Sequence, residues 1–137
     1  DISLKDFDTK FNADLANGLG NLVARVAKLC DTSRLEFENE KLNLGEGVKK
    51  SLEEFRFDSG LAEIWGRISQ QDKFLDQEKP WEQEDEALKK TLAQVVKEIR
   101  QTGVDLQPFM PETAEKILAQ FKGPKIKSES PLFPRLG

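Results

Sequence analysis

Apolar residues recur every three or four positions along most of the chain, which is the spacing of one face of an α-helix. The first such stripe predicts a long helix over residues 4–28, with Ser3 as its N-cap. Gly18 and Gly20 interrupt this helix, and each costs about 1 kcal/mol relative to alanine. We therefore expect a close neighbouring helix at these two positions, rather than a ligand.

Four further apolar stripes predict helices over residues 46–55, over 59–77, around 88–99, and from Pro111 onward. Residues 31–43 lack a clear period and are predicted to be a loop. Trp65, Phe55 and Phe57 belong to apolar stripes, and Trp65 is assigned to the core. The breaks fall at glycines and prolines: Pro80, then Gly103 and Pro108, then Gly123-Pro124.

These elements predict an all-α fold, an antiparallel helical bundle of about five helices joined by short connections. The length of 137 residues suits one domain. We assign residues 1–123 to the bundle and 124–137 to an extended C-terminal tail or linker of the same domain. The linker reading of the tail is favoured over contact with RNA.

The composition excludes several kinds of chemistry. The chain has no histidine and one cysteine, Cys30, so ordinary zinc sites, Ser-His or Cys-His nucleophiles and an intrachain disulfide are not expected. The apolar runs are too short for a membrane span, and no secretory leader is present. We expect a cytoplasmic protein, and the initial aspartate suggests a piece of a longer one.

Charge is unevenly distributed along the chain. The net charge of −4 argues against nucleic-acid binding if it is taken as a whole. However, residues 116–137 hold five basic residues and one acid, while residues 76–86 hold six acids and one lysine. Carboxylate pairs such as Glu53-Glu54 are expected to be solvated.

Three residues suit the recognition of an unstacked RNA base. Asn21 and Arg25 lie one helical turn apart on the same face, where an amide and a planar guanidinium can bind a base edge. Trp81 follows Pro80 at a corner and can stack on a base. From spacing alone, Asn21 and Arg25 are more often ordinary surface residues, and Trp81 is slightly more often a core plug.

Four short runs, in their order along the chain, resemble the anticodon-binding helical domain of bacterial-type methionyl-tRNA synthetases. They are Asn-Leu-Val-Ala-Arg at 21–25, Lys-Pro-Trp at 79–81, Pro-Phe-Met-Pro-Glu-Thr-Ala-Glu-Lys-Ile at 108–117, and Pro-Leu-Phe-Pro-Arg at 131–135. The family's His-Ile-Gly-His signature is absent, and so is Lys-Met-Ser-Lys-Ser, since the one methionine is Met110. The resemblance covers nearly the whole chain.

The resemblance implies the part of a methionine–tRNA ligase that recognises the CAU anticodon of methionine tRNA. Asn21 and Arg25 are expected to read the cytosine and Trp81 to stack on it. Asn17 is a supporting candidate, and Asp76 is expected to repel wrong anticodons. No catalytic residue or cofactor is expected here. ATP, with Mg or Zn, belongs to the parent's catalytic domain, which is the other expected partner; no membrane or DNA is expected.

The chain departs from the family after Trp81, where Glu-Gln-Glu-Asp-Glu occupies residues 82–86. These acids disfavour a phosphate contact by this segment and suit the start of the following helix. Two alternatives remain open. One is the anticodon domain of another class Ia synthetase. The other is a helical protein-interaction module without an RNA role, which the acidic pI favours.

Overall fold

The computed structural model describes residues 18–128, and in this part of the chain the regular secondary structure is helical. It contains α2 (Leu19–Ser33), α3 (Glu46–Glu53), α4 (Phe57–Glu78), the 3₁₀-helix η1 (Pro80–Glu82), α5 (Asp85–Leu106) and α6 (Pro111–Gln120). The all-α prediction, with five α-helices in the described residues, is confirmed. The predicted start of the first helix near residue 4 lies outside those residues.

Two helix boundaries differ from the prediction for identifiable reasons. α2 continues to Ser33, beyond the expected end at residue 28, and ends where Arg34 adopts a left-handed conformation with φ of 59°. α5 continues through Gly103, which was expected to weaken or end it. A Cβ atom at Gly103 would lie 2.9 Å from Leu118 Cδ2, so this glycine permits the close approach of α6.

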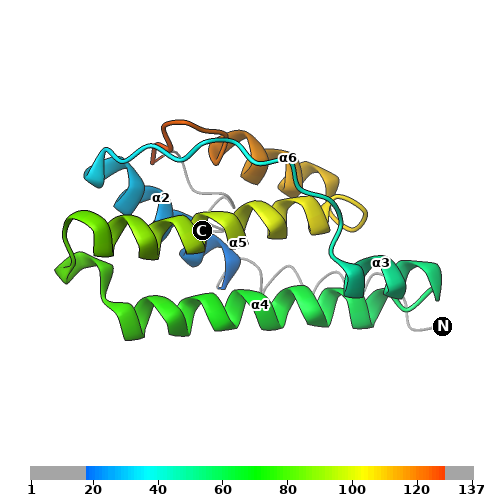
Figure 1. Cartoon of the computed structure of the whole chain (residues 1–137). Helices are drawn as coiled ribbons and strands as arrows, with labels where there is room; N and C mark the ends of the chain where they lie inside the picture. The colour runs from blue at the N-terminus through cyan, green and yellow to red at the C-terminus, as the bar shows by residue number, and fades with distance from the viewer. Residues whose placement is uncertain (1–17, 129–137) are drawn as a thin grey trace, which may run out of the picture.

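The helices surround one hydrophobic core. α4 and α5 lie side by side and antiparallel; α6 packs on α5, α3 packs on the beginning of α4, and α2 packs on both long helices (Figure 1). Fully buried side chains from several helices fill the space between them, for example Leu22, Ile64, Leu92, Ile99 and Ile117. Trp65 packs against this core and is partly buried, as predicted.

The turn between α3 and α4 corrects one assignment. Phe55 and Phe57 were assigned to apolar helix faces, but their exposed fractions are 81% and 46%. Phe55 follows the end of α3 with a left-handed φ of 59°, so the chain reverses before its side chain can join the core. The two rings instead meet edge to face, with centroids 6.4 Å apart.

Arg100 on α5 fastens the long α2–α3 connection to the bundle. Its guanidinium is buried and donates hydrogen bonds from Nε to the Phe121 carbonyl (2.9 Å), from Nη1 to that of Glu38 (2.7 Å) and from Nη2 to that of Phe37 (3.0 Å). The predicted loop at 31–43 therefore has irregular backbone after Ser33, yet it is held in one place. Burial lowers the pKa of Arg100, and the charge of Glu40 opposes that shift.

The chain after α6 returns to the same connection. Phe37 N–H donates to the Pro124 carbonyl at 2.7 Å, and Glu36 pairs with Lys125 in an isolated antiparallel bridge. Ile126 is only 2% exposed. Residues 124–126 therefore contact the α2–α3 connection, while the residues around Ile126 are exposed. The assignment of 124–137 to an extended tail or linker stays a prediction. The domain boundary near residue 123 stays a prediction.

Asp105 makes a second buried anchor, five residues after Arg100 and close to the C-terminal end of α5. One carboxylate oxygen accepts from Arg67 Nη1 of α4 at 2.6 Å, and the other accepts from Gly45 N–H at 2.8 Å, just before α3. Gln101 Nε2 donates to the same carboxylate at 3.0 Å. Because its side chain is fully buried and satisfied, Asp105 ties α3, α4 and α5 together.

Replacing Arg100 with methionine tests the importance of its anchor. The change leaves three backbone carbonyls without their donors, so we expect the free energy of unfolding to fall by about 3–5 kcal/mol. Urea denaturation followed by circular dichroism measures this. Arg56→Met is the control, because the Arg56 side chain is exposed and makes only a 3.9 Å pair with Glu54. Equal losses in both variants would contradict the role given to Arg100.

Candidate nucleic-acid interface

Trp81 stands out from the surface at the corner between the two longest helices. α4 ends at Glu78, Lys79 adopts a left-handed φ of 50°, and Pro80 begins η1. Pro80 is buried, whereas Trp81 is 53% exposed. The alternative in which Trp81 plugs the helix junction therefore does not hold, and its ring is available for stacking.

Arg25 of α2 lies beside this ring. Its guanidinium carbon is 5.9 Å from the Trp81 ring centroid, within the range of a cation–π contact. Two α4 carboxylates hold the same guanidinium: Asp76 Oδ1 is 3.4 Å from Nη2, and Asp72 Oδ1 is 3.8 Å from Nη1. The structure thus brings together Arg25, Trp81 and Asp76, which the sequence analysis singled out, and adds Asp72.

Asn21 lies one turn before Arg25 on α2 and is exposed. The residues between and beside them, Leu22, Val23 and Val26, are buried, as the sequence predicted. α2 therefore presents its polar residues to the surface beside Trp81 while its apolar side packs on the core. Asn17, the other supporting candidate, lies outside the described residues.

The surroundings of Asp72 disfavour the charged form of its carboxylate. Its partial burial raises its pKa above the ordinary 3.8; Arg25 opposes this shift, while Asp76 adds to it. Two acids on successive turns of α4 share one arginine, which leaves the cluster short of positive charge. An anionic ligand must therefore compete with Asp72 and Asp76 for the guanidinium.

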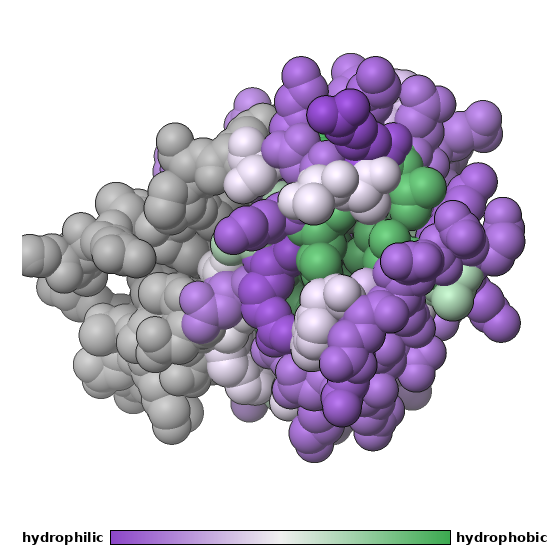
Figure 2. Space-filling model, turned by 90° about the vertical axis from the view of Figure 1, so that its left-hand side faces the viewer, coloured by the Kyte–Doolittle hydropathy of each residue, from purple (hydrophilic) through white to green (hydrophobic). Residues whose placement is uncertain are grey.

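A hollow of about 420 Å³ opens next to Trp81. Figure 2 shows apolar surface gathered in a hollow at this end of the molecule, with hydrophilic side chains around it. It lies between the second half of α2 and the η1 corner and is lined by Arg25, Lys28, Leu29, Thr32, Ser33, Pro80, Trp81, Gln83 and Leu88. Such a mixture of apolar floor and polar or cationic rim suits a planar, polar-edged ligand.

Sequence reasoning missed most of this lining. Lys28, Leu29 and Thr32 continue the face of α2 that carries Arg25, so their helical spacing was an available signal. Gln83 had no such signal, because only the fold places it against α2. The acids after it have the expected local role: Asp85 and Glu86 occupy the first turn of α5, where negative charge is favourable.

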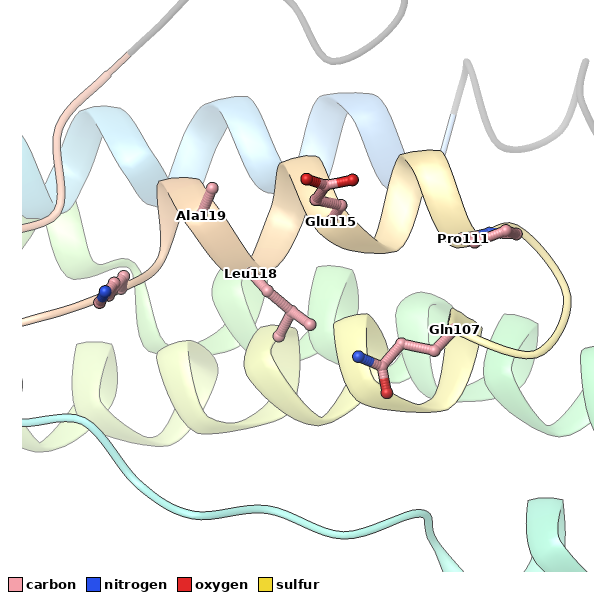
Figure 3. A pocket seen from close by; sticks show the side chains of 6 residues that line it. Gln107, Pro111, Glu115, Leu118 and Ala119 are labelled. Carbon is pink, nitrogen blue, oxygen red and sulfur yellow. The ribbon is translucent and has the colours of Figure 1, made fainter.

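A second hollow, of about 590 Å³, lies between the end of α5 and α6. Figure 3 shows Leu118 reaching from α6 toward α5, with Gln107 nearby and Glu115 above. Its lining contains no aromatic ring, so it offers no stacking surface, and its charged residues are the acid Glu115 and the base Lys122. It therefore serves as a comparison for the hollow beside Trp81.

Other chemistry finds no support within residues 18–128. Burial raises the pKa of the Cys30 thiol to about 12, which keeps it protonated and unreactive at neutral pH. These residues contain no group of three or more His, Cys, Asp or Glu side chains placed to hold a metal ion. Among the helices that the structure describes, none has the length and apolarity that crossing a membrane requires.

The bundle shares its fold with part of a solved methionyl-tRNA synthetase. It superimposes on the apo Mycobacterium tuberculosis methionyl-tRNA synthetase with a TM-score of 0.68 and 24% identity, covering 98% of this chain and 35% of that one. At this identity the match establishes the fold.

The sequence comparisons find similarity to part of several methionine–tRNA ligases. The chain is 28% identical over 170 aligned positions to methionine–tRNA ligase 1 of Bacillus anthracis, which covers 95% of this chain and 26% of the relative. It is 30% identical over 136 positions to the Enterococcus faecalis methionine–tRNA ligase, covering 85% of this chain and 20% of the relative. No protein-family model matches the chain.

The resemblance to methionyl-tRNA synthetases is therefore confirmed, and the chain is homologous to part of a methionine–tRNA ligase. The chain spans about a quarter of the length of relatives such as those of Bacillus anthracis and Caldanaerobacter subterraneus.

Truncating the two tryptophans distinguishes surface from core. Trp81→Ala should lower the free energy of unfolding by less than about 1 kcal/mol, because the ring is largely exposed. Trp65→Ala should cost about 3 kcal/mol, because that ring packs on the core. Urea denaturation followed by circular dichroism compares them; a larger loss for Trp81 would restore the core-plug reading.

The pH dependence of stability tests whether the charged form of Asp72 is unfavourable in the folded chain. Its pKa is raised in the folded state, so its unfavourable contribution is absent below about pH 3.8 and grows as pH rises through the folded value. Asp72→Asn should therefore be more stable than the parent at pH 7, and this advantage should vanish near pH 3. Thermal unfolding at both pH values measures it; a variant less stable at pH 7 would contradict the account.

Proposed function

We propose that this chain is the tRNA anticodon-recognition domain of a methionine–tRNA ligase and that its partner is the CAU anticodon loop. The proposal rests on the contact between Arg25 and Trp81, which are far apart in the sequence. The Arg25 guanidinium carbon lies 5.9 Å from the centroid of the Trp81 ring. An exposed ring beside a guanidinium provides a stacking surface and a fork of donors in one place.

Each residue has a distinct role in this proposal. Trp81 stacks on the unpaired cytosine, while Arg25 donates hydrogen bonds to its edge and Asn21 offers both a donor and an acceptor. Asp72 and Asp76 hold the guanidinium at a fixed position before RNA arrives. Asp76 also repels loops that place an electronegative edge or a phosphate beside it, which favours the correct base by penalising others.

The remainder of the ligase performs the chemistry in this proposal. As the family implies, a separate catalytic domain joins methionine to ATP as an adenylate and passes the methionyl group to the end of the tRNA. This chain supplies selection of the tRNA, in the cytoplasm, and contributes no catalytic residue. ATP and metal ions act in the catalytic domain alone.

A protein-interaction function is the second candidate. The acidic net charge of −4 and the exposed Phe55–Phe57 pair favour it. Those rings lie at the end of α4 opposite to Trp81, because α4 runs from Phe57 to the η1 corner (Figure 1). Binding that depends on the phenylalanines and not on Trp81 would support this candidate.

A titration with RNA hairpins tests the proposal. The chain is mixed at low salt with a CAU stem-loop, and with one whose first anticodon base is uracil, while tryptophan fluorescence is followed. We expect the CAU loop to bind at least about tenfold more tightly, because the cytosine edge is lost in the other loop. Arg25→Ala should remove this preference.

The matched control is Arg34→Ala, because Arg34 is an exposed arginine just beyond the end of α2. It should keep the preference for CAU and show only a small general loss of affinity from its charge. Equal binding of the two hairpins by the unaltered chain, or no binding at low salt, would overturn the proposed function.

A further inference from the structure

A run of lysines follows the middle of α6 and has no role at the Trp81 corner. Residues 116–128 hold four lysines and no acid: Lys116, Lys122, Lys125 and Lys127. The ion pairs found within residues 18–128 all belong to arginines, so these lysines have no acidic partner among the described residues. In a chain whose net charge is −4, this local positive charge is open to an anionic ligand.

Lys122 lines a hollow of about 300 Å³ that also contains two other bases. They come from distant elements, since Lys41 belongs to the α2–α3 connection and Arg100 to α5. The complete lining is Asn39, Glu40, Lys41, Leu42, Arg100, Val104, Leu118, Phe121 and Lys122. Three bases from separate parts of the chain therefore surround one space.

Hydrogen bonds hold the backbone beside each of the two lysines. The Gly123 N–H donates to Asn39 Oδ1 at 2.6 Å, which joins the residue after Lys122 to a residue two positions before Lys41. Arg100 donates to two backbone carbonyls of the same connection. The connection is thus fastened across α5 and to the end of α6 (Figure 1), so the three bases are gathered before any ligand binds.

The lining of this hollow has an excess of two positive charges. Glu40 is its one acid, against three bases. Arg100 is only 6% exposed, its three hydrogen bonds go to neutral carbonyls, and it has no ion pair within residues 18–128. A buried guanidinium without a paired carboxylate raises the positive potential of the space beside it, because water screens its charge poorly.

We propose that this hollow binds a phosphate group. Lys41 and Lys122, whose side chains are exposed, contact the phosphate oxygens, and Arg100 adds the attraction of its buried charge. The apolar part of the lining, which includes Leu42 and Val104, accepts the organic part of a phosphate ester. An RNA backbone and a free phosphate ester present the same group to these bases.

A second pair of lysines provides the contrast. Lys49 and Lys50 of α3 line a hollow of about 530 Å³, but three acids line it with them: Glu46, Glu53 and Glu54. The lining of that hollow is negative overall, so it repels an anion. The two lysine pairs therefore differ in the charge that surrounds them.

Titration of the whole chain with inorganic phosphate tests the proposal. Chloride keeps the ionic strength constant, and NMR of ¹⁵N-labelled chain follows the Gly123 amide, which is bonded to Asn39 beside the hollow. We expect phosphate to shift this signal to saturation. The double variant Lys41→Gln, Lys122→Gln should bind phosphate at least about tenfold more weakly, because two charge-assisted contacts are lost.

The matched control is the double variant Lys49→Gln, Lys50→Gln, which loses the same charge from the α3 hollow. It should bind phosphate as tightly as the unaltered chain. Both double variants should keep the melting temperature of the unaltered chain in chloride, since all four lysines are exposed. A Gly123 signal that phosphate leaves in place, or an equal loss of affinity in the two double variants, would overturn the proposal.

The same variants distinguish the two sources of the phosphate group. For an RNA phosphate, the change at Lys41 and Lys122 should weaken binding of the CAU stem-loop at least about tenfold more than the control change, with a smaller salt dependence. For a free phosphate ester, the two double variants should bind the stem-loop equally while only one of them loses inorganic phosphate. Arg25 and Trp81 do not line this hollow, so failure of the phosphate site leaves the proposed function intact.

Discussion

The arrangement of the bundle depends on the buried guanidinium of Arg100. One side chain on α5 donates to carbonyls of Phe37, Glu38 and Phe121, which belong to the long connection after α2 and to the end of α6. The helices alone could slide past one another along their apolar faces. Three directed hydrogen bonds from a planar group fix where the connection after α2 crosses α5.

The fixed end of α2 faces the corner at η1, and this pairing creates the candidate interface. Burial of Pro80 turns Trp81 outward, while the apolar side of α2 packs inward and leaves Arg25 beside the ring. Asp72 and Asp76 both pair with Arg25, so two negative charges share one positive charge. Arg25 is therefore held in place beside the ring before a ligand arrives. In the proposed function, the edge of a base replaces one of its carboxylate contacts.

Much of the fold follows from local patterns. Helical spacing located the five described helices, and Pro80, Pro108 and Pro111 marked their limits. The family motifs singled out Arg25 and Trp81. Spacing alone favoured an ordinary surface position for Arg25 and a core position for Trp81. Phe55 was misplaced because a left-handed residue reverses the chain, which the apolar period does not reveal. Arg100 and Asp105 were missed because the groups that they join to α5 are 21 to 63 residues away.

The central claim is that RNA binds at the corner that carries Trp81. The chain has two tryptophans, one at that corner and one against the core, so its indole N–H signals report on both places. Adding a CAU stem-loop to ¹⁵N-labelled chain should shift the Trp81 signal, assigned with Trp81→Phe, and leave that of Trp65 in place. A shift of Trp65 alone, or of neither, would contradict the account.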